Sequence, residues 1–327
     1  MCHYKHLSTS EREKLLFLKS KGYSITAIAQ EMNRNKSTIS RELSRNVESG
    51  EYWPSKADEK YRERRLECKP KKKLSDETLL KHVKSRFFVA QWSPEQIAGR
   101  LKEQYGHCII SYSTIYRAIY SGMLSEPGKS IASVIRKLRQ RGKRRRKRTK
   151  EERRGKIVIS YDINERPPEA QERTVVGHFE GDTVAGKQGK SCLVTMVDRK
   201  SRYLVCSKAT GKNSIDVRDA ILNMFANGQA RSITPDRGKE FARHAEVTEA
   251  LDGLPFYFPP AHQPWQRGTN ENTNGLLREY FPKGTDFDAI GSDEIERVVT
   301  LMNMRPRKCL GYKTPFEIYF SKLLHLA

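Results

Sequence analysis

The sequence predicts a multidomain protein with an all-α front half and a mixed α/β back half, and three observations support this division. At 327 residues the chain has room for two or three domains of ~150 residues each. Residues 1–155 hold 38 basic and 17 acidic side chains, whereas the remainder holds 24 and 22. Apolar residues recur at helical spacing in the front half, and β-rich runs begin only after about residue 157.

A pattern of three short helices opens the chain, over residues 8–46. We predict a first helix capped by Ser10 with Glu13 as a capping box, and a second helix opened by Ser24. The third helix would begin near Ser37 and bury Ile39 and Leu43. Its outer face would then present polar and basic side chains, as a recognition helix in a major groove does. The expected DNA contacts are Lys36, Ser37, Thr38, Ser40, Arg41 and Arg45.

An ordinary three-helix bundle with a polar face is the simpler interpretation of this pattern. The basic character of the front half favours a DNA-binding helix-turn-helix instead. Residues 47–90 are polar, basic and weakly patterned, which is typical of an exposed helix and a solvated linker.

A second helix pair over residues 92–122 repeats the first arrangement. Ser93 and Pro94 form a helix start, with Ser as the cap and Pro in the first turn. The stretch from Ser113 to Arg117 mirrors the one from Ser37 to Arg41. We therefore predict a second helix-turn-helix, although a packing helix pair without DNA contact fits the same pattern. Its expected DNA contacts are Ser113, Thr114 and Arg117.

The back half contains strands and helices in the order βββαβαβα. TVVGHFEGDTV, KSCLVTMVDRKS and RYLVCSKAT are three β-rich runs joined by short turns. A helix, a short strand at RSITPD, another helix, a strand at LPFYFP and two final helices follow. This is the order of the ribonuclease H-like fold, a mixed sheet with helices packed on it.

These patterns divide the chain into five segments. A dense basic run, RKLRQRGKRRRKRTKEERRGK, separates the two halves, and such runs bind phosphates without reading sequence. The predicted segments are a helix-turn-helix domain at 1–50, a basic helical linker at 51–90, a second helix-turn-helix module at 91–135, a basic linker at 136–160 and an α/β domain at 161–327.

The net charge of +23 indicates a polyanionic partner. High charge alone also fits solubility, a ribosomal role or a membrane-surface role. The concentration of the excess in the front half favours nucleic acid, and such binding should weaken steeply with salt.

Cysteine spacing and hydropathy exclude several other classes of protein. The six cysteines include no CxxC, which argues against a disulfide framework and a structural zinc site. No apolar run approaches ~18 residues, and the N-terminus lacks the apolar core of a signal peptide. We therefore expect no membrane partner and a reducing cytoplasm.

Three acidic residues stand out in the back half. Asp182 and Asp236 lie at or just past the ends of predicted strands, and Glu271 lies at the start of a predicted helix. Phosphodiester transfer requires neutralisation of charge on the attacking and leaving oxygens, which two divalent ions held by carboxylates provide. Mg²⁺ prefers oxygen ligands and takes few protein carboxylates. The sequence therefore predicts that Asp182, Asp236 and Glu271 converge on a pair of metal ions.

Each acid alone is weak evidence, because an Asp after a strand is often a turn or cap residue. Glu240, four residues past Asp236, is as consistent with a supporting acid near the site as with a surface residue. The loop before Glu271 contains Arg267, a candidate phosphate contact, and His262 and Trp265, candidates for contacts with DNA ends. The acids that compete with the three are Glu180, Asp198, Glu240 and Glu279.

At these motifs the sequence resembles the DDE transposases of bacterial insertion sequences, most closely the insertion sequence thirty family. The matching stretches are STISRELSRN, ERPPEAQERTVVGHFEGDTV, TPDRGKEF, PWQRGTNENTNGLLREYFPKGTDF and RPRKCLGYKTPFE.

The resemblance implies that Asp182, Asp236 and Glu271 form a catalytic triad that holds two Mg²⁺ or Mn²⁺ ions. The helix-turn-helix modules would recognise the terminal inverted repeats of the element. Water activated by metal would cut the DNA at each element end, and the freed 3′-hydroxyl would attack target DNA. We expect the protein to act on double-stranded DNA as a homo-oligomer, in the cytoplasm with the nucleoid, and without a small-molecule substrate.

Two other functions are compatible with the same motifs. One is a DNA-binding regulator built on a transposase scaffold without catalysis. The other is a ribonuclease H-type nuclease that cuts without strand transfer, which two DNA-binding modules before the catalytic domain disfavour.

Overall fold

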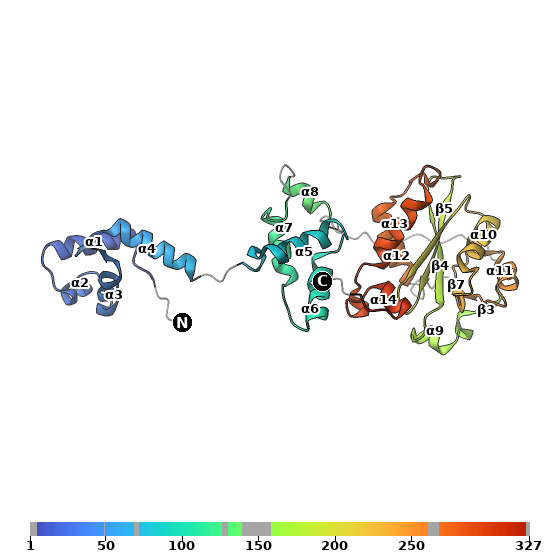
Figure 1. Cartoon of the computed structure of the whole chain (residues 1–327), viewed down its shortest axis with the longest axis horizontal. Helices are drawn as coiled ribbons and strands as arrows, with labels where there is room; N and C mark the ends of the chain where they lie inside the picture. Colours follow the sequence, from blue (N-terminus) through green and yellow to red (C-terminus); the bar gives the residue numbers. More distant parts are fainter. Residues whose placement is uncertain are drawn as a thin grey trace. The chain divides into compact units, whose positions relative to one another are not determined.

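The chain folds into two compact units, Met1–Ser75 and Asp76–Ala327, which are described separately (Figure 1). The computed structural model describes residues 5–48, 50–68, 72–125, 130–138, 158–260 and 268–324.

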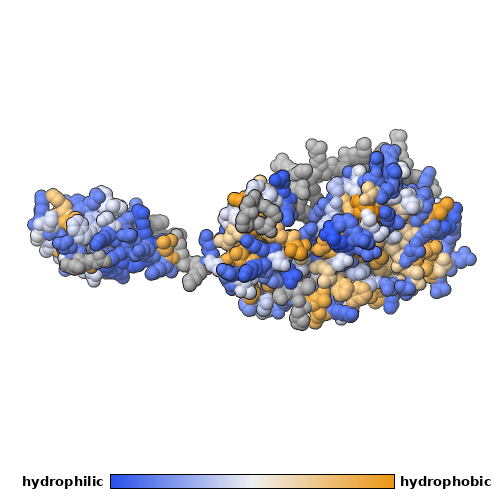
Figure 2. All heavy atoms as spheres, turned by 45° about the horizontal axis from the view of Figure 1, so that its top comes forward, coloured by the Kyte–Doolittle hydropathy of each residue, from blue (hydrophilic) through white to orange (hydrophobic). Residues whose placement is uncertain are grey.

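The first unit is a small helical domain around one apolar cluster. Leu15, Ile28 and Ile39 come from three successive helices and are almost fully buried together. Hydrophilic residues cover most of the face of this unit that Figure 2 shows. Its elements are α1 (Thr9–Ser20), α2 (Ile25–Glu31), α3 (Lys36–Asn46), a hairpin of β1 (Val47–Glu48) and β2 (Glu51–Tyr52), and α4 (Pro54–Glu67).

The helix starts of this unit differ from the prediction in one place. The capping box is formed by Ser8 and Glu11, so the predicted pair Ser10 and Glu13 is wrong. Both pairs have the same spacing, but Leu7, directly before the actual cap Ser8, is buried and the helix starts two residues earlier than predicted. The predicted cap at Ser24 is confirmed, because its side chain accepts the backbone N–H of Ala27.

A buried arginine ties α4 to the other helices of the first unit. The side chain of Arg12, 2% exposed, donates to Glu42 on α3 and to Asp58 on α4, each at 2.7 Å. Ala57 on α4 is fully buried in the same cluster. Residues 51–90, which the sequence analysis assigns to a linker, thus include a helix that packs within this unit.

The second unit begins with four helices. Ser93 caps the second of them in a capping box with Gln96, and Pro94 is its first residue, as the sequence predicts. Gly106 ends the same helix in the left-handed region, at φ 72°. The four helices are α5 (Glu77–Phe88), α6 (Pro94–Tyr105), α7 (Tyr112–Tyr120) and α8 (Ile131–Ile135).

A four-stranded mixed sheet forms the centre of the rest of the second unit. The strand order is β6-β5-β4-β7, with β4 antiparallel to β5 and parallel to β7. This topology confirms the predicted ribonuclease H-like arrangement. The strands are β4 (His178–Ala185), β5 (Cys192–Asp198), β6 (Leu204–Ala209) and β7 (Ser232–Thr234).

Helices cover both faces of the sheet and make two apolar clusters (Figure 1). Phe179, on β4, packs with Val217 and Phe225 of α10 on one face. Val184, also on β4, packs with Leu277 of α12 on the other face. Alternation along β4 therefore turns Glu180 and Asp182 towards α12. The covering helices are α10 (Ser214–Phe225) and α11 (His244–Ala250) on one side, and α12 (Gly268–Tyr280) and α13 (Ser292–Asn303) on the other.

Several short elements were not anticipated from the sequence. The predicted strand LPFYFP is reduced to β8 (Tyr257–Phe258), which pairs in parallel with β3 (Tyr161–Asp162) and meets β7 through a bridge at Phe256. A short helix α9 (Pro168–Glu172) precedes β4. The predicted final helix is α13, but α14 (Pro315–Phe320) follows it.

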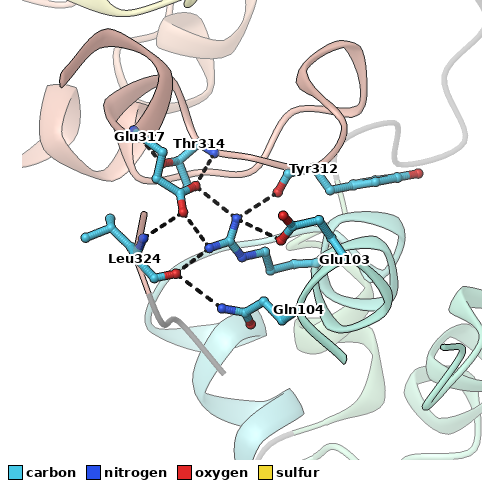
Figure 3. Close-up of polar contacts among 7 residues, drawn as sticks. Glu103, Gln104, Tyr312, Thr314, Glu317 and Leu324 are labelled. Carbon is cyan, nitrogen blue, oxygen red and sulfur yellow. Dashed lines mark hydrogen bonds and ion pairs between the residues drawn. The ribbon is translucent and has the colours of Figure 1, made fainter. Parts of the chain in front are cut away.

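A buried ion pair joins α6 to α14 (Figure 3). Arg100 donates to both carboxylate oxygens of Glu317, at 2.9 and 2.6 Å. It also donates to the backbone carbonyls of Tyr312 and Leu324. Both side chains of the pair are at most 3% exposed.

Close packing accompanies this ion pair. A Cβ placed on Gly99 would lie 2.3 Å from the Tyr312 ring, so only glycine allows the ring to rest on α6. At the surface, Lys308 pairs with Glu95 at 2.9 Å. Helix α6 and residues 308–324 are therefore held together by buried as well as exposed contacts.

In the part of the chain that the structure describes, no helix has the length and apolar character needed to cross a membrane.

We predict that Glu317→Gln destabilises the second unit by about 3–5 kcal/mol, because it leaves the Arg100 cation buried without its carboxylate. Guanidinium denaturation of the full chain measures this loss.

Glu294→Gln is the matched control, since it breaks an exposed pair with Arg297 and should leave the stability almost unchanged. Equal losses of stability for the two substitutions would show that the ion pair of Arg100 and Glu317 stabilises the protein no more than a surface ion pair does.

Candidate active site and DNA-binding surfaces

The two predicted aspartates lie beside each other on neighbouring parallel strands. Glu180 of β4 pairs with Thr234 of β7, and Asp182 and Asp236 each follow two residues later. Parallel strands reach the same edge of a sheet with their carboxyl ends, so both side chains are positioned at one edge. Asp182 lies within β4, which continues to Ala185, and not at its end as predicted. The neighbouring strand β7 is shorter and ends at Thr234, opposite Glu180, so Asp182 lies just beyond the end of β7.

Helix α12 lies against β4 at Asp182. Asn274 Nδ2 donates to Asp182 Oδ2 at 3.0 Å, and Thr195 Oγ1 on β5 donates to Asn274 Oδ1 at 3.1 Å. Glu271 is exposed in the first turn of α12, three residues before Asn274. Residues three apart share a helix face, so Glu271 belongs to the face of α12 that contacts β4 at Asp182.

The chain after Asp236 makes a tight turn. Asp236, 8% exposed, accepts the backbone N–H of Gly238 at 2.9 Å. A Cβ on Gly238 would lie 2.7 Å from Asp236 Oδ1 and 2.4 Å from Glu240 Oε2. The absence of a side chain at Gly238 therefore lets the carboxylates of Asp236 and Glu240 approach the same point.

Glu240 lies beside the predicted acids. It accepts hydrogen bonds from Thr183 on β4 and pairs with Lys212 at 3.0 Å. Burial opposes its ionisation, but hydrogen bonds from its own backbone N–H, Lys212 and Thr183 outweigh burial and lower its pKa. Glu240 thus remains ionised next to Asp236.

The predicted convergence of Asp182, Asp236 and Glu271 is not reached as one metal-binding cluster in the described residues. Among the residues that the structure describes, no three His, Cys, Asp or Glu side chains are placed together to hold a metal ion.

Glu180 has a different environment from Asp182, although both face α12. Its side chain is fully buried, pairs with Arg199, and accepts the backbone N–H of Asn270 at 3.3 Å. Asp198 is also fully buried and accepts hydrogen bonds from Ser201, so it is a turn residue. Both rivals are occupied by structural contacts.

The predicted DNA-contact residues lie on exposed helix faces. On α3, Ile39 and Leu43 are buried as predicted, and the six candidate residues are exposed or half-buried. On α7, Ser113 and Arg117 are exposed, and Thr114 is half-buried beside the cap residue Ser111. The predicted contacts His262, Trp265 and Arg267 lie outside the described residues.

Sequence reasoning missed two polar side chains of this region. Asn274 supports Asp182, and its spacing of three residues from Glu271 could have indicated it. Lys212 reaches Glu240 from the loop before α10, and no sequence pattern relates the two residues.

Comparison with known proteins defines the class. A family model described as a helix-turn-helix domain matches residues 3–46, and one described as an integrase core domain matches residues 173–262. A helix-turn-helix module joined to an integrase core of this topology is the organisation of a transposase.

Relatives extend this similarity over nearly the whole chain. The transposase InsI of element IS30A from Escherichia coli K12 is 40% identical over 323 residues, which cover 96% of this chain and 83% of that one. The transposase of IS1086 from Cupriavidus metallidurans is 34% identical, over 96% and 94%. That of IS4351 from Bacteroides fragilis is 36% identical, over 96% and 95%. The chain belongs to the IS30 family of insertion-sequence transposases. These relatives support transposase function and not a regulator without catalysis.

We predict that Gly238→Ala lowers DNA cleavage by about 100-fold, because a displacement of about 1 Å at a catalytic group has an effect of this size. The added Cβ would push apart the carboxylates of Asp236 and Glu240. Cleavage of DNA that carries the element ends, in the presence of Mg²⁺, measures the effect.

Gly291→Ala is the control, since a Cβ there meets nothing within 4 Å. Wild-type cleavage by Gly238→Ala would mean that the turn after Asp236 does not position catalytic groups.

Proposed function

We propose that this transposase is a DDE enzyme in which Asp182, Asp236 and Glu271 are the catalytic acids. One observation carries the assignment: the parallel pairing of β4 and β7 positions both aspartates at one sheet edge, beside α12, whose first turn contains Glu271.

The donor set fits Mg²⁺ or Mn²⁺. The three side chains offer carboxylate oxygens, which are the ligands that these ions prefer, and no soft sulfur ligand is required. When bound, two ions would neutralise charge on the attacking and leaving oxygens of the phosphodiester.

Residues of the chain would keep these carboxylates in position. Asn274 donates to Asp182, and the backbone N–H of Gly238 donates to Asp236, so neither side chain rotates freely. Lys212 and Thr183 keep Glu240 ionised beside Asp236 and offset part of the repulsion between the acids. Fixed carboxylates cost little reorganisation when the DNA arrives.

The proposed reaction has two steps at the same acids. Hydrolysis first cuts a strand at the element end, and the 3′-hydroxyl then displaces a phosphodiester oxygen of target DNA. The exposed faces of α3 and α7 would hold the element ends, with Arg41 of α3 and Arg117 of α7 among the contacts. We propose that the enzyme works as a homo-oligomer in the cytoplasm, since two ends must be cut and joined.

We predict that Asp182→Asn lowers cleavage by more than about 100-fold, the scale on which positioned electrostatic groups act. The amide keeps the shape of the side chain and can still accept from Asn274, so folding and DNA binding should be unchanged. Cleavage and gel-shift assays on the same end DNA measure the two properties.

Asp219→Asn removes an equal charge from an exposed aspartate on α10 that pairs with Arg218 and should leave cleavage intact. A parallel Glu271→Gln and Glu240→Gln comparison identifies the third acid. Cleavage that survives Glu271→Gln but not Glu240→Gln would replace Glu271 by Glu240 in the proposal.

We predict that Arg41→Ala weakens binding to the element ends by about 1–3 kcal/mol, the contribution of an arginine that contacts a base edge. Arg62→Ala, on α4 of the same unit, removes the same charge from an exposed arginine that pairs with Asp58 and serves as the control. Fluorescence anisotropy with end DNA and with unrelated DNA measures both. Equal losses for the two variants would remove α3 from sequence recognition.

A further inference from the structure

A pocket lies beside the first turns of α12, on a different side of the helix from Glu271. It has a volume of about 300 Å³. Thr269 and Thr273, one helical turn apart, contribute its α12 wall, whereas Glu271 and Asn274 belong to the face directed at Asp182. The lining residues are Arg173, Arg202, Gly268, Thr269, Asn272, Thr273, Arg307 and Cys309.

The pocket is strongly electropositive. Three of its lining residues are arginines, and none of the described lining residues is acidic. The carboxylate of Glu180 attracts the guanidinium of Arg173 electrostatically. Glu180 is, however, fully buried and already forms an ion pair with Arg199. Burial lowers the pKa of Arg199 to about 10; Glu180 opposes this shift, while Arg173 and Arg202 add to it. One carboxylate therefore faces more guanidinium groups than it can neutralise.

The backbone of two of these arginines is unusual. Arg173 has φ 63° and Arg202 has φ 64°, both in the left-handed region. This region favours Gly and Asn and is uncommon for other residues. Arg173 is the C-cap residue of α9, and the N–H of Arg202 closes the turn after β5 by donating to the carbonyl of Asp198. Two turns from separate parts of the chain therefore each contribute an arginine to this pocket.

The remaining lining groups suit an anion with several oxygens. The N-terminus of α12, a helix of 13 residues, carries partial positive charge and opens at Gly268 beside the pocket. Arg202 Nη1 donates to Thr269 Oγ1 at 2.8 Å, which orients the guanidinium on the helix. Planar guanidinium groups match the paired oxygens of phosphate.

We propose that this arginine pocket binds a backbone phosphate of the DNA on which the enzyme acts. It would fix a strand against the turn of α12 that carries Glu271, on the side away from the acids. The proposal rests on the proposed function in its choice of DNA as the source of the phosphate.

The test uses the full-length chain, in the presence of EDTA, and end DNA. Arg173→Asn removes the charge and places a residue in the left-handed conformation that tolerates it. The slope of log K against log salt should fall by about 0.9, the value for one lost phosphate contact. Arg202→Asn should act similarly, and the melting temperature of Arg173→Asn should not decrease. Arg297→Gln, an exposed arginine on α13, is the charge-matched control and should keep the wild-type slope.

Inorganic phosphate separates the two sources of the ligand. If it raises the melting temperature of the wild type but not of Arg173→Asn, while the salt slopes agree, the pocket binds free phosphate and the assignment to DNA is overturned. If wild type and Arg173→Asn have equal salt slopes and phosphate changes neither melting temperature, the pocket binds no phosphate and the proposal is overturned. A reduced slope for Arg173→Asn supports the pocket even if the wild type fails to cleave DNA with Mg²⁺, an outcome that would reject only the proposed chemistry.

Discussion

The buried carboxylate of Glu180 is the contact on which the geometry of the candidate site depends. It joins three parts of the fold: strand β4, the turn after β5 through Arg199, and the first turn of α12 through the N–H of Asn270. Loss of either charge would leave the other uncompensated in the core, which is strongly destabilising. Because Asp182 follows Glu180 on the same strand face, this contact joins the start of α12 to the strand face that carries Asp182. The site is thus positioned by a structural acid two residues from a proposed catalytic one.

Charge has two roles in this transposase, and burial separates them. In the proposed function, exposed basic residues on α3 and α7 would bring positive charge to the DNA. Arg199 is held by buried contacts with Glu180 and the carbonyl of Ala170, and the half-buried Arg202 donates to Thr269 in the first turn of α12. Fixed charges lose little entropy on binding, so they suit the placement of a strand near the acids, whereas long exposed side chains suit capture of DNA.

Much of the fold follows from periodicity and cap residues. The burial of Ile39 and Leu43 at helical spacing and the order βββαβαβα both agree with the structure. The start of α1 was wrong by two residues because Ser8 and Ser10 have the same spacing to a glutamate. Contacts between distant segments could not be predicted. The ion pairs of Arg100 with Glu317 and of Lys212 with Glu240 join residues far apart in the sequence, and no motif around these residues indicates their partners.

The ion pair between Arg100 and Glu317 bears on how such proteins can evolve. The helices α5–α8 share a compact unit with the catalytic sheet, and a buried charge on each side of the junction requires the other. The first unit contains its own core and its own buried arginine, Arg12. Recombination between genes could therefore exchange the first unit and alter the DNA that is recognised. An α6 taken from another gene would instead have to carry a cation at the position of Arg100, to pair with Glu317. Diversity among relatives with this architecture should accumulate upstream of residue 76.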